Sequence, residues 1–305
     1  MIALWIVLGG LLGWFLLNLK TSRPDGQLVK RVHPYRQMMF YIMPTTTESV
    51  FLASLDIPAE KLEAYLAEAG PKLEANVSHV AVGALIRAMA EVPKMNRFVM
   101  GGRLYQRNAV EVAFSMKRKK LDPDSKVSVV KIAAQEGEDF AALCARINAE
   151  VSTERTDVKT YADKEFDLFG YLPHGALKIA PRLFRWLDAH NILPGGFIEN
   201  DTLYCSAFLA NLGSLKMPSG HHHLFEWGNC PVFVTIGEIV SKPAVVDGAV
   251  VVQRQIPVRI TYDERIDDGL TARAGLRRLE TVLADPARHL GCVKDDGSDR
   301  VALTG

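Results

Sequence analysis

Residues 79 to 99 read HVAVGALIRAMAEVPKMNRFV and join a buried helix to the turn that follows it. The apolar positions are nearly continuous from Val77 to Glu91, which predicts a helix with Ser78 as a plausible cap. The next stretch, Arg97 to Arg107, alternates around a central Gly-Gly pair, and paired glycines supply the positive φ that tight hairpin turns need. A helix that leads into a hairpin indicates a fold that mixes helices and strands.

The segments on either side repeat this mixture. β-Branched and aromatic runs predict strands at 49–57, 110–116, 127–132, 203–209, 232–239 and 249–262. Apolar residues at helical spacing predict helices at 58–69, 139–151, 166–190 and 269–283, the third interrupted by two prolines. The order lacks a strict strand–helix alternation, so we expect an α+β fold with a mixed sheet rather than a doubly wound one.

The composition is that of an ordinary globular protein. The 305 residues include 36 Lys and Arg against 35 Asp and Glu, so the net charge gives no reason to expect nucleic acid as a partner. The four cysteines lie far apart, without CxxC or Cys/His spacing. Free thiols in a reducing compartment are the simplest interpretation, while the sequence leaves a disulfide open. We expect no metal site.

The N-terminus departs from this composition. Met1 to Leu17 carries no charge, and 17 residues are at the short end of the length that crosses a bilayer. The alternative is a signal peptide, but no basic residue precedes the apolar stretch and no small-residue cleavage site follows it. Basic residues such as Lys20 and Arg23 follow instead, which predicts that the C-terminal part is cytoplasmic. We predict a single-pass transmembrane anchor at 1–19, a linker at 20–42, a domain at 43–286 and a tail at 287–305.

Three segments, in this order, resemble the catalytic (acyltransferase) domain of 2-oxoacid dehydrogenase complexes and the chloramphenicol acetyltransferase-like superfamily. Residues 46–107 are similar to that family's strand, helix and proline-then-Asn passage. FLANLGS, residues 208–214, resembles its NLGS strand end. YDERIDDG, residues 262–269, lies where the family carries a signature of Asp-His, three residues, then Asp-Gly. The resemblance covers roughly residues 43–286, which is most of the chain.

This resemblance implies a chloramphenicol acetyltransferase-like mixed β-sheet sandwiched by helices, in a homotrimer or a higher homo-oligomer. In the family, the signature histidine acts as general base on the attacking thiol or hydroxyl. A hydroxyl side chain just before NLG stabilises the tetrahedral oxyanion. The two groups come from neighbouring subunits, so the resemblance places the site at a subunit interface.

The sequence departs from the family at both chemical positions. Glu264 occupies the base position, and Ala210, which has no donor, occupies the oxyanion position. These departures remove the usual chemistry and spare the architecture. The residues that remain are the structural ones of the signature, whose aspartate forms an ion pair in the family, and of the turn: Asp268, Gly269, Asn211 and Gly213.

Three consecutive histidines, His221 to His223, follow the NLGS stretch by a short loop. The surrounding GHHHLFEWGNC resembles a branch of the family that has HHLxEWG at this place. One interpretation is that His222 or His223 supplies the missing base, with Glu226 or Glu264 orienting the ring, because histidine titrates near neutral pH. The other is a polar loop whose histidines bond to backbone carbonyls at a subunit contact. A shared metal is disfavoured, since neighbouring residues on an extended chain point to opposite faces.

Glu264 itself has two interpretations. It acts as a base in its own right if burial raises its pKa. Otherwise it is a structural carboxylate paired with Arg265 or Arg259.

Two basic segments complete the candidates. The first is a run on a loop between predicted strands: Lys117, Arg118, Lys119 and Lys120. It either binds the phosphates of coenzyme A or is a solvated charge run. The second is the helical segment 166–190, in which a basic face adjoins an apolar stripe: Lys178, Arg182 and Arg185 beside Leu177, Ala180, Leu183, Phe184 and Leu187. That segment either lies on a bilayer surface or packs on the domain or on a neighbouring trimer.

Two functions of different classes follow from these features. The sequence contains neither a lipoyl domain nor a subunit-binding domain, which argues against a swinging-arm role and makes a coenzyme A thioester the expected acyl donor. The leading hypothesis is a membrane-anchored acyltransferase-like enzyme with a small-molecule acceptor, no permanently bound cofactor and a non-standard base near His222. The alternative, motivated by Ala210 and Glu264, is an inactive trimeric scaffold, a pseudoenzyme that keeps the fold.

Overall fold

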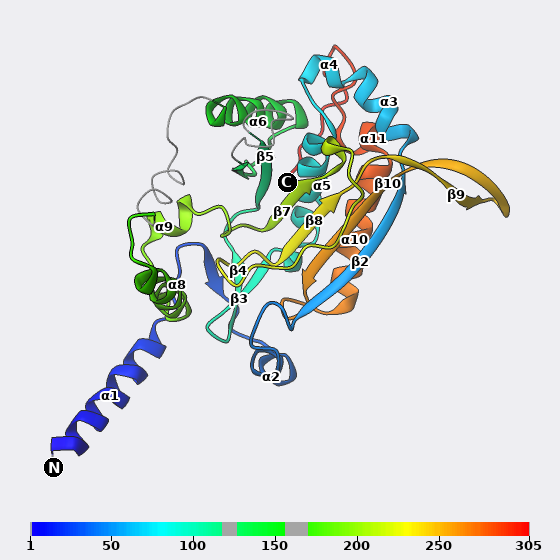
Figure 1. The fold of residues 1–305 in the computed structure, drawn as a ribbon. Coiled ribbons are helices and arrows are strands. Elements are labelled where there is room, and N and C mark those ends of the chain that lie inside the picture. The colour runs from blue at the N-terminus through cyan, green and yellow to red at the C-terminus, as the bar shows by residue number, and fades with distance from the viewer. Residues whose placement is uncertain (1, 118–126, 156–169, 305) are drawn as a thin grey trace.

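The computed structural model describes residues 2–117, 127–155 and 170–304. Its central sheet consists of β2 (Val50–Pro58), β5 (Glu111–Lys117), β6 (Val127–Ala133), β7 (Ala207–Asn211), β8 (Val232–Ile236), β9 (Val240–Val246) and β10 (Ala249–Asp263). The strands follow the order β2-β10-β8-β7-β5-β6, and β9 pairs with β10 (Figure 1). β5, β7 and β8 run parallel to one another, whereas the other pairs are antiparallel. The predicted mixed sheet is therefore confirmed.

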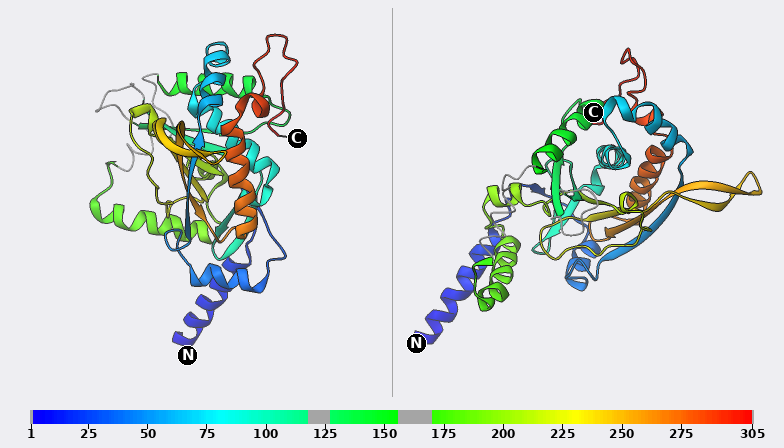
Figure 2. Two further views of the ribbon diagram at one scale, coloured as in Figure 1. Left: turned by 90° about the vertical axis from the view of Figure 1, so that its right-hand side faces the viewer. Right: turned by 45° about the horizontal axis from the view of Figure 1, so that its top comes forward.

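Helices cover one face of this sheet (Figure 2). The long ones are α5 (Val77–Glu91), α6 (Phe140–Glu154) and α10 (Gly269–Ala284), and α3 (Glu60–Glu68), α4 (Gly70–Leu73) and α11 (Pro286–Leu290) lie at one end of this layer. Two 3₁₀ turns, Pro93–Met95 and Gly213–Leu215, follow α5 and β7. Ten of the 15 residues of α5 are buried, because it contacts the sheet as well as α6 and α10.

The predicted bounds of α5 are confirmed, but its cap differs. Asn76, not Ser78, is the capping residue: its side-chain oxygen accepts a hydrogen bond from the Ser78 N–H at 2.9 Å. The Asn76 N–H in turn donates to Nδ1 of His79 at 3.2 Å. These reciprocal bonds satisfy backbone groups that a helix start leaves open.

The opposite face of the sheet carries a smaller apolar cluster. Phe208 and Ala210 of β7 and Phe233 of β8 belong to it, together with Leu224 from the loop at 217–226. Alternate residues of a strand point to opposite faces, so these side chains lie on the other side of the sheet from α5. A loop rather than a helix therefore covers this part of the second face.

A second sheet of three strands lies beside the first. It consists of β1 (Gly26–Leu28), β3 (Arg97–Met100) and β4 (Arg103–Arg107), in the order β1-β4-β3. The predicted hairpin is confirmed, since its turn residues Gly101 and Gly102 have φ of 57° and 71°. A Cβ on Gly101 would lie 2.1 Å from the carbonyl oxygen of Ala189, at the end of α8 (His174–Ala189), so the close approach requires glycine.

The segment predicted as a linker, 20–42, is part of this fold. It contains β1 and the helix α2 (Pro34–Ile42). Arg23, whose side chain is fully buried, donates to Oδ1 of Asp25 at 2.9 Å and to Oδ1 of Asp188 on α8 at 2.7 Å. The interpretation as a plain linker was wrong because these contacts join residues 165 positions apart, which local sequence does not reveal.

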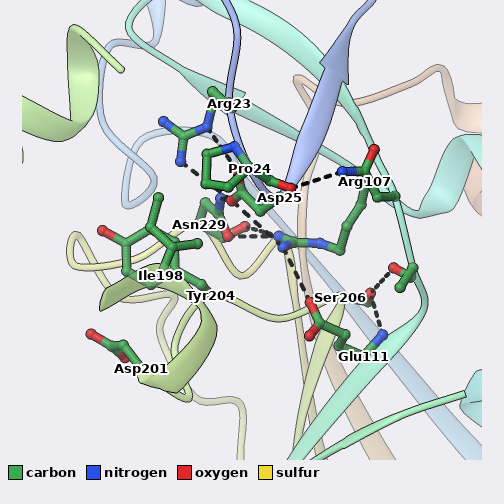
Figure 3. A network of polar contacts seen from close by, with 12 residues as sticks. Arg23, Pro24, Asp25, Arg107, Glu111, Ile198, Asp201, Tyr204, Ser206 and Asn229 are labelled. Atoms are coloured by element: carbon green, nitrogen blue, oxygen red, sulfur yellow. Dashed lines mark hydrogen bonds and ion pairs between the residues drawn. The ribbon is translucent and has the colours of Figure 1, made fainter. Parts of the chain in front are cut away.

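This polar network continues into the second sheet (Figure 3). Arg107 of β4 donates to Oδ1 of Asn229 at 2.6 Å, and Asn229 donates to Oδ2 of Asp25 at 2.6 Å. Tyr204 donates to Oδ2 of Asp188 at 2.8 Å. Burial alone would raise the pKa of Asp25, but the Arg23 guanidinium holds it below its usual value. We call Arg23, Asp25 and Asp188 together the Arg23 clasp.

The N-terminal residues form α1 (Ile2–Leu19), which extends away from the sheets (Figure 1). Across the described residues, no helix is both long and apolar enough to span a bilayer. This finding corrects the prediction of a transmembrane anchor at 1–19.

The C-terminal segment, predicted as a tail, is packed against the domain. Beyond α11, the Leu303 N–H donates to the Glu138 carbonyl at 2.8 Å, and Leu303 itself is buried. The Tyr65 hydroxyl donates to the Gly291 carbonyl at 2.9 Å. The helix predicted at 166–190 is α8 in its described part, with Pro181 inside it, and α9 (Gly195–Asn200) follows.

One ribbon projects beyond the sheet. Residues 249–255 of β10 pair with β9, and the pairing of β10 with β2 begins at Gln255 (Figure 1). Val250 and Val252 on this ribbon are 78% and 83% exposed. Two strands alone are marginally stable in water, so exposed valines on such a ribbon favour contact with another surface.

Candidate functional site

A cavity lies where the parallel strands end. β5, β7 and β8 meet the N-terminus of α5 there, around a space of about 900 Å³. Ligands in sheets with parallel strands commonly bind outside the carboxyl ends, and a helix N-terminus attracts negative charge. Three residues that the sequence singled out, Asn211, Gly213 and Lys117, line this one cavity.

Asn211 and Gly213 shape the wall of the cavity, as expected for the NLG turn. The side-chain N–H of Asn211 donates to Oγ of Ser78 at 2.9 Å, and its oxygen accepts from the Ser214 N–H at 3.1 Å. A Cβ on Gly213 would lie 2.5 Å from the carbonyl oxygen of Gly237, so a larger residue does not fit. The turn after β7 is thereby fixed against α5.

Two residues at the start of α5 also line the cavity. Ser78 accepts its hydrogen bond from Asn211, which leaves its hydroxyl proton to donate. His79 is buried, and burial lowers its pKa, so its ring is neutral. Its Nδ1 accepts from Asn76, so Nε2 carries the proton and donates to Oδ1 of Asn148 at 3.1 Å. The sequence indicated Ser78 only as a cap, because its contact with Asn211, 133 positions along the chain, is not visible in sequence.

Basic side chains gather at the same cavity. Lys117 and Arg155 line it, and Arg254 lines it while forming a bidentate pair with Glu63 at 2.7 and 2.8 Å. The predicted phosphate-binding residues Arg118 and Lys119 lie outside the described residues.

A second groove, of about 460 Å³, lies between β2, β10 and α10. It brings together Glu264, Asp268 and Gly269. Asp268 is the cap of α10: it accepts from the Thr271 N–H at 2.9 Å, and this bond lowers the pKa of its carboxyl. The role seen here is thus a helix cap, where the resemblance implied an ion pair.

Glu264 is exposed in this groove. Its proposed structural partners are engaged elsewhere, since Arg265 pairs with Asp263 at 2.8 Å and Arg259 with Asp56 at 3.1 Å. The predicted pairing of Glu264 with either arginine is therefore wrong. The reason is that each arginine finds a carboxylate on its own or the adjacent strand.

Asp267 is a candidate acid that sequence reasoning missed. Its carboxyl is buried at the groove, where Oδ2 accepts from the Tyr262 hydroxyl at 2.6 Å and Oδ1 has no hydrogen-bond partner in the described structure. Burial raises its pKa to about 6. The sequence offered one signal for Asp267, which is the pair Asp267-Asp268 before a helix. Only one of two adjacent carboxylates can be the helix cap, so the other needs a different role.

Replacing Asp267 with Asn is expected to abolish a pH-dependent loss of stability. The wild-type carboxyl has a pKa of about 6 when folded and 3.8 as the reference value, so the folded state binds more protons between these values. Stability therefore falls as the pH rises through this window, by about 3 kcal/mol. Urea unfolding of both proteins from about pH 4 to pH 7 measures the effect. Parallel stability curves for the two proteins would contradict the assignment.

The three histidines lie on the second face of the sheet. His221 donates through Nε2 to the Ala53 carbonyl at 3.0 Å. The ring of His222 stacks on Phe233, with centroids 4.1 Å apart and planes 12° apart, and Phe233 stacks on Phe208 at 4.8 Å. His223 stacks on His222 at 4.5 Å.

His222 has a defined tautomer. Its Nδ1 lies 2.7 Å from the carbonyl oxygen of His223, and a carbonyl only accepts, so Nδ1 carries the proton. Nε2 then keeps its lone pair, which is the form that a general base requires. Glu226 does not orient this ring, because it accepts from Thr46 and Thr47. Burial alone would raise the pKa of Glu226, but these bonds hold it below its usual value. The prediction that Glu226 orients His222 was therefore wrong, because the Glu226 side chain points toward Thr46 and Thr47.

The two positions at which the family carries its chemistry are far apart within one subunit. Ala210 pairs with Thr235, and Thr235 pairs with Arg259. Glu264 lies five residues beyond Arg259, which is about 17 Å along a strand at roughly 3.3 Å per residue. His222, unlike Glu264, lies on the same sheet face as Ala210. Its ring stacks on Phe233, which stacks on Phe208, and both phenylalanines share an apolar cluster with Ala210.

Part of the chain resembles a known family in sequence. Residues 228–290 match the family model described as 2-oxoacid dehydrogenases acyltransferase (catalytic domain). A stretch of 52 residues is 46% identical to the dihydrolipoyllysine-residue succinyltransferase component of 2-oxoglutarate dehydrogenase complex 1, mitochondrial, of Arabidopsis thaliana. That stretch spans 17% of this chain and 11% of the plant protein.

Solved structures match over a much longer range. A probable dihydrolipoamide acetyltransferase from Listeria monocytogenes matches 85% of this chain and 94% of its own, with 12% identity and a TM-score of 0.54. The cubic core of the pyruvate dehydrogenase multienzyme complex matches 85% and 93%, with 15% identity and a TM-score of 0.54. A chloramphenicol acetyltransferase matches 85% and 99%, with 12% identity and a TM-score of 0.53. Identities this low show the fold, and the predicted chloramphenicol acetyltransferase-like fold is confirmed.

Proposed function

We propose that the protein is an acyltransferase that uses coenzyme A thioesters and forms its site between subunits of a homotrimer, with His222 as the base. The tautomer of His222 carries this proposal, because the 2.7 Å contact of Nδ1 with a carbonyl leaves Nε2 able to accept a proton. The fold shared with acyltransferases supports the reaction class.

The reaction balances with the groups named. Nε2 of His222 takes the proton from the hydroxyl or thiol of the acceptor, whose oxygen or sulfur attacks the thioester carbonyl carbon. The tetrahedral intermediate collapses with cleavage of the C–S bond. The coenzyme A thiolate leaves and takes the proton from the imidazolium, which restores the base.

The 900 Å³ cavity is the proposed place of the acyl donor. A helix N-terminus and basic side chains favour the phosphates of a coenzyme A thioester, and α5 with Lys117 and Arg155 supplies both. The Ser78 hydroxyl offers a neutral donor on the same wall. No permanently bound cofactor is part of this proposal.

Two features support a homo-oligomer. His222 does not line the 900 Å³ cavity and stacks on Phe233 on the sheet face opposite α5, so a site that joins this base to a donor in the cavity needs a second subunit. The β9–β10 ribbon exposes valines beyond the sheet edge, which suits contact with another copy. All four cysteines of the chain are buried, unpaired thiols, which supports a reducing, cytoplasmic location for the domain.

An inactive trimeric scaffold remains the second candidate, on one specific observation. Ala210 is packed in the apolar cluster with Phe208 and Phe233 and offers no hydrogen-bond donor to an oxyanion. Loss of one such donor costs about 10² to 10³ in rate in other enzymes. The scaffold hypothesis therefore predicts a trimer that does not turn over acyl-coenzyme A thioesters.

The test measures release of free thiol when the purified full-length protein is mixed with acyl-coenzyme A thioesters and candidate acceptors. Turnover above the rate without protein supports the acyltransferase. A trimer by light scattering that turns over no thioester supports the scaffold. A monomer contradicts both candidates.

A further inference from the structure

The exposed side of α8 carries two parallel rows of side chains. Ile179, Leu183 and Trp186, spaced by four and three residues, form an apolar row and are 64%, 51% and 45% exposed. The basic row beside it consists of Lys178, Arg182 and Arg185, all exposed. Residues three and four apart are neighbours on a helix, so each row is continuous. The six residues are called the outer face of α8.

The other side of α8 holds the helix in place. Phe184 and Leu187 pack on a cluster of Leu193, Ile198 and Tyr204. Asp188 accepts from Arg23 in the clasp, and the following Asn191 donates to the carbonyl oxygen of Lys20 at 2.8 Å. The stripe seen in the sequence is therefore divided: part of it packs inward, and Leu183 remains on the outer face.

Other exposed apolar side chains lie at the same end of the molecule. The turn at Gly101 contacts Ala189, and a Cβ on Gly102 would lie 3.1 Å from the hydroxyl of Tyr41 on α2, so α8 and α2 meet the same hairpin. The C-terminal end of α1 joins them, because Arg103 donates to the Asn18 carbonyl at 2.6 Å (Figures 1 and 2). Exposed apolar residues of α2 are Tyr35, Met38, Tyr41 and Ile42.

We propose that the outer face of α8 docks on the surface of an anionic lipid bilayer. Its charges are all of one sign: Asp188, the only acidic residue of α8, is buried against Arg23. Within the described part of the chain, no ion pair within 4.0 Å holds Lys178, Arg182 or Arg185, although Arg185 is near enough to Glu226 to help lower the pKa of that carboxyl. Basic side chains attract anionic headgroups, while Trp and aliphatic side chains enter the boundary between headgroup and acyl chain.

A protein partner fits this face less well. An apolar protein surface would leave Lys178 and Arg182 without counter-charges, whereas a lipid surface supplies phosphates beside an apolar layer. The rows lie side by side along one helix, which suits a flat, laterally uniform surface. The proposal is independent of acyl transfer and needs no residue of the candidate site.

The test uses the full-length protein with Leu183→Cys labelled by an environment-sensitive fluorophore, since the four native thiols are buried. Vesicles of phosphatidylcholine with phosphatidylserine are expected to shift the emission to the blue, and vesicles of phosphatidylcholine alone to do so much more weakly. A label at Val245→Cys on the β9–β10 ribbon is the control and is expected not to shift.

Charge reversal gives the second arm. Lys178→Glu with Arg182→Glu is expected to weaken the affinity of the Leu183-labelled protein for anionic vesicles at least about thirtyfold. The reason is that each Lys or Arg near an anionic surface strengthens binding by roughly fivefold. Arg288→Glu with Lys294→Glu makes the same charge change on exposed residues at the far end and is expected to leave it unchanged. Equal binding by both double variants overturns the proposal. A shift that grows with protein concentration without vesicles also overturns it and indicates a contact between copies.

Discussion

His222→Ala lowers kcat/KM for transfer of an acyl group from coenzyme A by about 10² to 10⁴, the usual worth of a positioned general base. The effect is large because the ring is held on Phe233 and its proton is held on Nδ1 by the His223 carbonyl. Alanine removes the Nε2 lone pair that accepts the proton in this proposal. Thiol release at limiting thioester concentration measures the ratio.

Two variants separate this role from others. His221→Ala removes a ring that bonds to the Ala53 carbonyl and is expected to leave the rate nearly unchanged. Glu264→Gln tests the position where related enzymes carry their base, and a small effect is expected because that side chain is exposed in a separate groove. A large loss with Glu264→Gln and none with His222→Ala would reverse the assignment of the base.

Arg23→Met destabilises the fold by about 3 to 5 kcal/mol, because it leaves the buried Asp188 without its counter-charge and leaves Asp25 with Arg107 at 3.8 Å. The Arg23 side chain is fully buried and donates to Asp25, Asp188 and Asn191. Burial already raises the pKa of Asp188 despite Arg23, so the loss of the cation leaves a costly charge or forces protonation. Urea-induced unfolding measures the difference.

The matched control is an exposed ion pair of similar geometry. Arg254→Met breaks a bidentate contact with Glu63 in which both side chains are more than a third exposed, so a cost below about 1 kcal/mol is expected. Adding Asp188→Asn to Arg23→Met is expected to recover part of the loss by removing the uncompensated charge. Equal costs for Arg23→Met and Arg254→Met would show that the clasp contributes little.

Local patterns predicted the parts of the fold that local forces determine. The bounds of α5 follow from its apolar run, and the hairpin turn follows from Gly101 and Gly102, which the backbone requires at positive φ. The segment at 20–42 was misinterpreted because its polar residues find partners far away, as Arg23 does on α8. A polar stretch with Pro and Gly looks the same in sequence whether or not such partners exist.

The candidate site was predictable to a similar extent. The sequence singled out the NLG turn and Lys117 separately, and the structure places both at one cavity, where strand ends and a helix start converge. The tautomer of His222 depends on the carbonyl of the next residue, and the pKa of Asp267 depends on burial beside Tyr262. Both are properties of three-dimensional surroundings that residue type does not carry.

The strand order also determines when the sheet can form during synthesis. β2 pairs with β10, so Val50 cannot form its strand pair until Asp263 has been synthesised. A ribosome adds about 5 to 20 residues per second, so the intervening chain of about 200 residues takes roughly 10 to 40 s. During that interval the nascent β2 has no partner strand from the end of its own chain. We therefore expect cotranslational chaperones to engage β2 until β10 emerges.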